Sequence, residues 1–231
     1  MRRVYKEVTA RPVAGGWGVF LDGRPLRTPA KRELTVPSGK LAEAIAAEWD
    51  VQETDVRPHT MPLTRLTATA IDHTAAARDK VVAEIASYAG TDLVCYRAEQ
   101  PPALAARQHA AWQPLIDWAA MRYDAGLTVT AGILPQPQSP ASLRVFSAVV
   151  GAFDDFQLTA LQALTAACGS LVIALALAEG RIDPEAAFAV SQLDETFQIE
   201  AWGEDAEATH RRALLAEDIA AAARFLQLLD G

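Results

Sequence analysis

The side chains best suited to chemistry or recognition lie in one short stretch near the C-terminal end of the chain. If this stretch is helical, Asp194, Gln198 and Trp202 line one side of it. Glu195 lies on the adjoining side, and His210 follows closely in the sequence. Carboxylates and an imidazole are the groups that general acid–base catalysis uses, so an enzyme of an unrecognised class with an acidic site around Asp194 and Glu195 is one hypothesis.

The same stretch has two interpretations that involve no catalysis. It is either a half-buried helix with a solvated acidic face, or a polar-rimmed docking surface with Trp202 as its anchor. Spacing alone favours neither of them. A generic protein-interaction scaffold is a third possibility.

Familiar catalytic and cofactor-binding motifs are absent from the sequence. It contains no GxGxxG, GxxxxGK[ST], GxSxG or HExxH pattern. The four histidines have no second His or Cys three or four positions away, which argues against a metal site. The two cysteines, Cys95 and Cys168, lie far apart in apolar surroundings, so we expect free thiols. We therefore predict no catalytic residue, no metal and no cofactor, and a protein that is not an enzyme.

Charge is unevenly distributed along this chain of net charge −8. Residues 1–65 carry 11 basic and 8 acidic side chains, whereas residues 183–218 carry 2 and 10. A nucleic-acid-binding protein needs a basic stripe, and none is visible, so no nucleic-acid partner is predicted. The acidic region fits either a partner with a basic surface or a solvated face that aids solubility.

The elements that must position these side chains change from strands to helices along the chain. Residues 4–36 combine short apolar runs with turn signals, of which Asp22-Gly23 is the strongest, so they predict antiparallel strands. Ser38 is a suitable N-cap for a helix that runs to Gln52. Pro58 and Pro62 exclude regular helix from the next segment, which we interpret as a linker.

The first predicted helix is amphipathic. Leu41, Ile45 and Trp49 recur at four-residue spacing, and Glu48 and Gln52 lie on or beside the same stripe. Because polar groups flank a large aromatic side chain, Glu48, Trp49 and Gln52 are candidates for structural or partner-binding roles.

The rest of the chain is predicted to be a helical array. Helices are expected at residues 75–88, 104–123, 142–154, 158–178, 183–203 and 206–229. Residues 156–178 carry no charge, but polar side chains dilute them and no aromatic–basic belt flanks them, so a buried central helix is favoured over a membrane span. Strands followed by helices predict an α+β fold: a small antiparallel-β domain with one helix at 1–57 and a larger all-α domain at 58–231.

Several ordered motifs together resemble a known family. They are Trp17-x-Val19-x-Leu21-Asp22-Gly23-Arg24, Leu41-Ala42-x-Ala44-Ile45-Ala46-x-Glu48-Trp49-x-x-Gln52, Met61-Pro62-Leu63-Thr64, Thr91-Asp92-Leu93-Val94-Cys95-Tyr96-Arg97, Gln108-x-x-x-Trp112-x-Pro114-Leu115 and Leu193-Asp194-Glu195-x-Phe197-Gln198-x-Glu200-x-Trp202-Gly203. This set is similar to the F1-ATP synthase assembly chaperones that act on the α subunit. The resemblance covers nearly the whole chain.

The resemblance implies a molecular chaperone that binds the free F1-ATPase α subunit and assists assembly of the α3β3 hexamer. It implies a small β-containing domain before a larger helical one, no ATP hydrolysis by the chaperone, and no stable insertion into the membrane. It places the functional acidic position of the family on Asp194, Glu195 and Gln198. Together with Trp202, the anchor suggested by the helical spacing, these residues are the predicted partner-binding site. We expect a monomer.

The resemblance also bears on location. Mitochondrial members of the family carry a transit peptide and act in the matrix. The N-terminal residues of this chain contain neither an apolar signal region nor a long Arg/Ser-rich presequence. We therefore expect a bacterial, cytoplasmic member.

Overall fold

The computed structural model describes residues 2–132, 134 and 136–230. The chain forms two compact units, each assembled from segments that are separated in sequence. The first contains the described residues of Met1–Arg78, Asp154–Ala160 and Ala221–Gly231, and the second contains Asp79–Phe153 and Leu161–Ala220. The small β-containing N-terminal part and the larger helical part confirm the α+β class. The domain division at 1–57 and 58–231 stays a prediction.

An antiparallel sheet forms the N-terminal part of the first unit. Its strands are β1 (Val8–Val13), β2 (Gly16–Leu21), β3 (Arg24–Pro25) and β4 (Thr35–Val36), with β2 paired to the other three. The predicted turn at Asp22-Gly23 joins β2 to β3, and both residues have positive φ, 48° and 77°. A two-residue hairpin turn of this kind requires positive φ at both positions, which explains the Asp-Gly pair.

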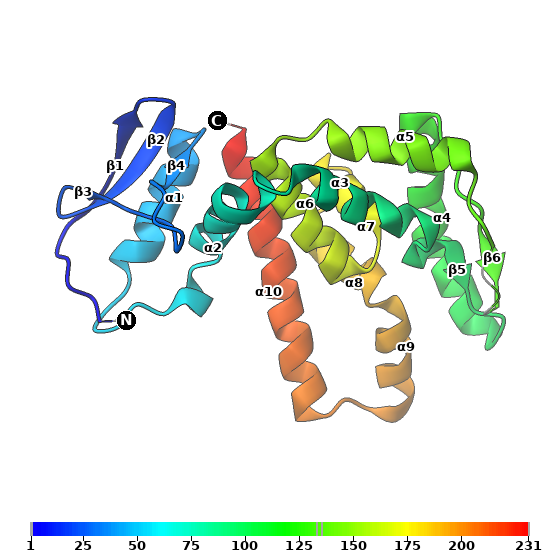
Figure 1. Ribbon diagram of the computed structural model, residues 1–231. Coiled ribbons are helices and arrows are strands. Elements are labelled where there is room, and N and C mark those ends of the chain that lie inside the picture. The colour runs from blue at the N-terminus through cyan, green and yellow to red at the C-terminus, as the bar shows by residue number, and fades with distance from the viewer. Residues whose placement is uncertain (1, 133, 135, 231) are drawn as a thin grey trace. The chain divides into compact units, whose positions relative to one another are not determined.

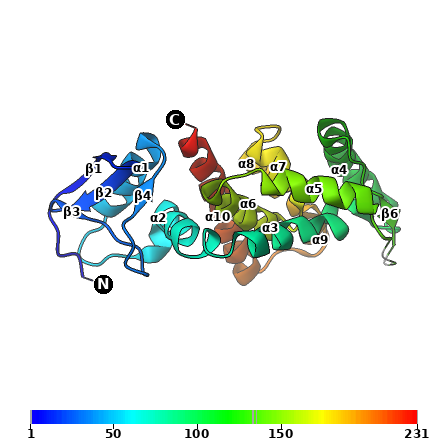
Figure 2. The ribbon, with the colours of Figure 1, turned by 45° about the horizontal axis from the view of Figure 1, so that its top comes forward.

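The helix α1 (Gly39–Asp50) lies along one face of this sheet (Figure 1 and Figure 2). The side chain of Ser38 accepts a hydrogen bond from the backbone N–H of Leu41, as expected for an N-cap. Leu41, Ile45 and Trp49 are all buried, so the predicted apolar stripe is the face that packs. They join a hydrophobic core that includes Tyr5, Val19, Leu26, Leu34, Val36, Val56, Met61, Leu63, Ala160 and Phe225.

A second helix, α2 (Pro62–Thr69), follows a 3-10 turn at Pro58–Thr60. Proline suits its first position because that backbone N–H would lack a partner in the helix. The helix runs directly into a π-helical turn at Ala70–Thr74. The segment predicted to be a linker is therefore short. Pro58 lies in the 3-10 turn, and Pro62 begins α2.

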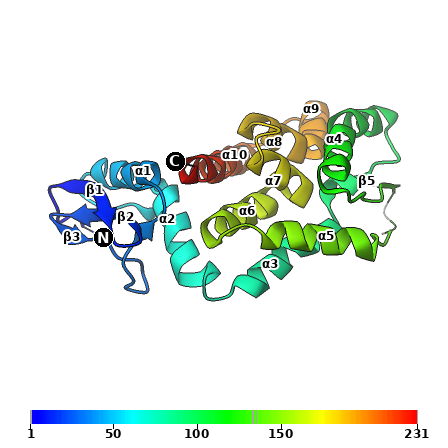
Figure 3. The same cartoon turned by 90° about the horizontal axis from the view of Figure 1, so that it is seen from above.

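The second unit is mainly helical. Its elements are α4 (Pro102–Tyr123), α5 (Pro140–Gly151), α7 (Leu171–Ala178), α8 (Pro184–Ser191) and α9 (Leu193–Trp202), with most of α3 (Arg78–Ser87) and the adjoining parts of α6 (Asp155–Cys168) and α10 (Ala206–Leu229). Helices α4, α7, α8 and α9 lie side by side (Figure 3). Two short parallel strands, β5 (Tyr96–Arg97) and β6 (Thr130–Ala131), pair beside them, a feature that the sequence pattern did not predict.

Two long helices predicted from the sequence are each divided in the structure, so both predictions were wrong in this respect. The helix expected at 158–178 is broken at Gly169, which has φ of 64°, and Ser170 then caps α7 by accepting from the N–H of Ile173 at 3.0 Å. The helix expected at 183–203 is broken at Gln192, between α8 and α9.

Helix α7 is buried along its length, from Leu171 to Leu177. The buried carboxylate of Asp92 accepts hydrogen bonds from the N–H groups of Val94 at 3.2 Å and Val172 at 3.0 Å. Burial raises the pKa of Asp92 to about 6, although these hydrogen bonds act in the opposite direction. In the described part of the chain, no helix combines the length and apolarity that crossing a membrane requires.

Candidate functional site

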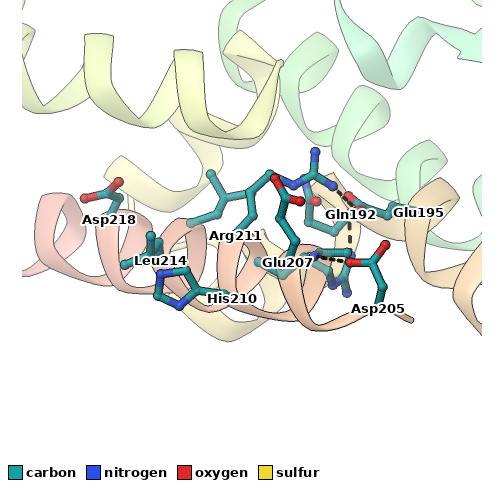
Figure 4. A pocket seen from close by; sticks show the side chains of 11 residues that line it. Gln192, Glu195, Asp205, Glu207, His210, Arg211, Leu214 and Asp218 are labelled. Carbon is teal, nitrogen blue, oxygen red and sulfur yellow. Dashed lines mark hydrogen bonds and ion pairs between the residues drawn. The ribbon is translucent and has the colours of Figure 1, made fainter. Parts of the chain in front are cut away.

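The candidate site is a groove between α9 and the first half of α10. The two helices form a hairpin whose connection begins at Gly203, where φ is 84° (Figure 1). A positive φ is easily adopted by glycine and ends α9 there. The groove has a volume of about 870 Å³. Its walls combine acidic, basic and apolar side chains, among them Glu195, Asp205, Arg211, Leu214 and Asp218 (Figure 4).

Glu195 is the acidic centre of this groove. Its carboxylate forms an ion pair with Arg211 and lies 3.7 Å from the guanidinium of Arg212. The side chain is 30% exposed, so the carboxylate remains accessible from the groove. Glu195 therefore presents a negative group that two arginines already hold in position.

Arg212 anchors α10 to the elements around it. Its guanidinium donates to the hydroxyl of Thr196 at 2.9 Å and lies 3.2 Å from the carboxylate of Glu204. It also lies over the ring of Phe188, 5.2 Å from the centroid, and only 14% of the side chain is exposed. A cation that is largely removed from water is stable only when it is paired in this way, so Arg212 has a structural role.

Asp194 faces α4 rather than the groove. Its carboxylate accepts a hydrogen bond from the side-chain amide of Gln108 at 2.8 Å, and the amide oxygen of Gln108 accepts from the N–H of Ala98. The nearby residue Arg97 is 9% exposed, and its guanidinium donates to the carbonyl of Gln108 at 3.3 Å. Burial lowers the pKa of Arg97, whereas the charge of Asp194 partly restores it. Asp194 therefore ties α9 to the interior of the second unit.

The other two predicted partner-binding residues on α9 are exposed. Gln198 lies on the solvent side of the helix, and Trp202 is 82% exposed at its C-terminal end. An indole that remains so exposed is unusual, because large apolar side chains gain free energy from burial. Of the four α9 candidates, Glu195 lines the groove, Gln198 and Trp202 are accessible, and Asp194 points inward.

The three candidates from the first predicted helix lie in the first unit. The carboxylate of Glu48 accepts from the N–H groups of Leu63 and Thr64 at 2.7 and 2.8 Å and thereby caps the start of α2. The amide of Gln52 is buried and bonds to the backbone of Glu48 and the hydroxyl of Thr60. Trp49 is 8% exposed. The contacts of Glu48 and Gln52 join α1 and the segment just after it to the residues that begin α2 and to the turn before it.

The arrangement offers little to acid–base catalysis. Figure 4 shows Arg211 reaching toward Glu195, whereas His210 lies away from it. Among the described residues, no hydrogen bond joins His210 to Asp194 or Glu195. The carboxylate of Glu195 is paired with two arginines, Arg211 and Arg212, and in the described part of the chain no imidazole lies beside it to exchange a proton with it (Figure 4). Within residues 2–132, 134 and 136–230, no group of three or more His, Cys, Asp and Glu side chains could hold a metal ion.

The basic side of the groove was not predicted from the sequence. Glu195 pairs with Arg211 and Thr196 with Arg212, so each pair is 16 residues apart across the turn. In a helical hairpin, residues equidistant from the turn face each other. The sequence contains a signal that could have predicted these pairs. It is an acidic helix followed by a glycine and then by two adjacent arginines 16 residues after Glu195 and Thr196.

Comparison with known proteins agrees with this fold. A family model described as ATP12 chaperone protein matches residues 2–120. The chain is 26% identical over 214 residues to a Schizosaccharomyces pombe protein named "Protein atp12, mitochondrial", covering 87% of this chain and 74% of the relative. The structure of Atp12 from Paracoccus denitrificans is 44% identical, with a TM-score of 0.95 over 99% of this chain and 98% of the other.

A further solved structure, of a protein from Agrobacterium tumefaciens, is 41% identical with a TM-score of 0.95 over 99% of this chain and 86% of the other. The similarity therefore includes the helices after residue 120, which the family model does not reach. The chain belongs to the ATP12 chaperone family.

Proposed function

We propose that this protein binds the free α subunit of F1-ATPase and assists its assembly into the α3β3 hexamer. Membership of the ATP12 chaperone family supports the role of an assembly chaperone. The observation that carries the partner-binding part is the exposed Trp202 at the C-terminal end of α9, the helix that contributes Glu195 to a groove with a charged rim. Hot spots of protein interfaces are commonly an aromatic anchor surrounded by polar groups.

The physical task of such a chaperone fits this surface. An unassembled subunit exposes an apolar interface that would otherwise aggregate. Trp202 and Leu214, which are 82% and 47% exposed, offer apolar surface, while Glu195, Asp205 and Asp218 supply a polar rim. Covering an interface and later releasing it requires an affinity between roughly micromolar and nanomolar, about −8 to −12 kcal/mol.

We further propose that the protein acts without catalysis, as a monomer, in the bacterial cytoplasm. The pairing of Glu195 with arginines and the lack of a catalytic motif in the sequence support a binding role. The solved relatives come from bacteria, which supports the proposed location.

The direct test is binding of purified F1 α and β subunits to the immobilised protein. We expect the α subunit to be retained and the β subunit to pass through. Trp202→Ala should weaken retention of α at least about tenfold, as expected for an aromatic hot spot. The matched control is Met121→Ala on α4, because Met121 is 81% exposed but lies outside the groove.

Failure to bind the α subunit, or undiminished assembly of F1 in cells that lack the protein, would overturn the proposal. Equal losses from Trp202→Ala and Met121→Ala would overturn the assignment of the α9–α10 groove.

A further inference from the structure

A second hollow lies within the first compact unit. It has a volume of about 530 Å³, which falls in the range of pockets that hold small ligands or side chains. Its walls come from the segment between β3 and β4, the end of α1, the residues before α2, α2 itself and the π-helical turn. Leu34, Trp49, Val56 and Met61 give it an apolar wall. The cavity is therefore suited to an apolar group.

One wall residue has an unused hydrogen-bond donor. Trp49 is 8% exposed, and its indole N–H finds no acceptor among the described residues. The ring itself is fixed, since it packs against Tyr5 at 5.7 Å between centroids and Tyr5 donates its hydroxyl to the backbone carbonyl of Trp49 at 2.7 Å. Buried donors are rarely left without an acceptor. A bound molecule could supply the acceptor that the indole N–H of Trp49 lacks.

The π-helical turn at Ala70–Thr74 brings two further polar residues to the cavity, Asp72 and His73. Turns of this kind are rare and occur frequently at functional sites. The carboxylate of Asp72 is already engaged, because it accepts from the hydroxyl of Thr28 at 2.8 Å and from the N–H of Ala30 at 3.1 Å. Its negative charge is therefore satisfied within the protein.

The charged side chains at the cavity are otherwise cationic. Arg27 and Arg65 both line it and both are exposed residues. The side chain of Arg27 is 57% exposed although it lies 3.6 Å from Glu33. Lys31 follows in the same segment and is exposed, and the next residue, Arg32, is exposed but pairs with Asp72 at 3.9 Å. This excess of positive charge favours an occupant that carries carboxylates beside its apolar part.

We propose that this cavity binds a peptide segment in which a bulky apolar side chain is flanked by acidic residues. The apolar side chain fills the space against Leu34, Val56 and Met61. A backbone carbonyl of the peptide accepts from the indole N–H of Trp49, and the acidic side chains meet Arg27 and Arg65. The inference goes beyond the proposed function, because the cavity is separate from the α9–α10 groove and its occupant is defined by chemistry alone.

The test uses fluorescein-labelled hexapeptides and fluorescence anisotropy with the full chain. In the probe peptide, phenylalanine and leucine stand between aspartates. One control peptide replaces both apolar residues by alanine, and another replaces the aspartates by lysine. We expect the probe to bind and each control to bind at least about tenfold more weakly, since each lacks one half of the recognition.

Three variants locate the binding. Ala68→Phe places a ring in the cavity and should weaken the probe about tenfold, whereas the matched control Ala47→Phe, on the exposed side of α1, should not. Arg65→Glu should weaken the probe, whereas Arg24→Glu, which makes the same charge change outside the cavity, should not. Trp49→Phe removes only the indole N–H and part of the ring, so a loss of a few-fold is expected.

A readout at Trp49 itself completes the test. The chain has five tryptophans, and the indole N–H resonance missing from Trp49→Phe identifies that of Trp49 in a nitrogen–proton correlation spectrum. Addition of the probe should move this resonance. Binding that is unaffected by Ala68→Phe and Arg65→Glu would overturn the proposal. Tighter binding of decanoate than of the probe would overturn the assignment of a peptide ligand.

Discussion

The carboxylate of Asp194 accepts a hydrogen bond from the side-chain amide of Gln108, which precedes it by 86 residues, at 2.8 Å. Gln108 is 1% exposed and also supplies an acceptor to the backbone of Ala98. One acidic residue of α9 is thus fixed to α4. Its neighbour, Glu195, is left to line the groove. Adjacent residues of one helix have different roles because their side chains point about 100° apart.

Asp194→Ala should destabilise the protein. The substitution leaves the buried amide of Gln108 without an acceptor and removes the charge that acts on the buried Arg97, a cost of about 2 kcal/mol in the free energy of unfolding. Urea denaturation monitored by circular dichroism measures this cost. Asp194→Asn keeps an acceptor for Gln108 and should lose less. Equal losses in the two variants would assign the effect to the charge alone.

Glu195→Lys should weaken partner binding more than folding. The substitution puts a third cation beside Arg211 and Arg212. The native side chain of Glu195 is 30% exposed and lines the groove. The Arg211 side of this pairing is exposed and contributes roughly 0–1 kcal/mol, and Arg212 keeps Glu204 as its partner, so the melting temperature should fall little. Binding of the α subunit should fall at least about tenfold.

The matched control for this variant is Glu217→Lys, which makes the same charge change at an exposed position of α10 outside the groove. A parallel fall in melting temperature and binding on Glu195→Lys would show that the residue is structural.

Trp49→Arg should be mainly destabilising. It replaces a ring that is 8% exposed and packed against Tyr5 with a guanidinium that has no partner there, at a cost of about 3 kcal/mol or more. Thermal unfolding gives the measurement. The same change at the 82% exposed Trp202 should leave the melting temperature nearly unchanged. A well-folded Trp49→Arg protein with normal melting but no partner binding would contradict this expectation.

Stability should depend on pH through Asp92. Burial raises its pKa from 3.8 to about 6, so between these values the folded protein binds a proton that the unfolded chain has lost. The contribution is full below pH 3.8 and is lost as the pH rises through about 6, a change of roughly 3 kcal/mol. Denaturation midpoints measured between pH 4 and 7 should show this fall, and Asp92→Asn should flatten it. A stability that rises over this interval equally in both proteins would contradict the prediction.

Both thiols should be inert in the folded protein. Burial raises the pKa of Cys95 and of Cys168 to about 12, and reaction with a thiol reagent requires the thiolate. At pH 8 we expect an aromatic disulfide reagent to label neither cysteine of the native protein and both in denaturant. Cys168→Ala shows which thiol reacts if one does. Rapid labelling of the native protein would refute the expectation.

The sequence by itself determined the local elements. Spacing along residues 39–50 predicted the buried stripe of Leu41, Ile45 and Trp49, and the Asp22-Gly23 pair predicted a hairpin turn, because backbone preferences and amphipathic periodicity act between near neighbours. The ordered motifs predicted the family, and the family model and the solved relatives confirm it.

Only the tertiary structure decided which polar groups meet. Nothing near Asp194 in the sequence indicates that its partner is Gln108, or that Glu48 caps α2 instead of lining a surface. The breaks at Gly169 and Gln192 escaped prediction because the sequence on both sides of each break favours helix, and the positive φ of Gly169 is a feature of the folded backbone. Side-chain pairing between segments far apart in the sequence depends on how those segments pack, and periodicity carries no record of it.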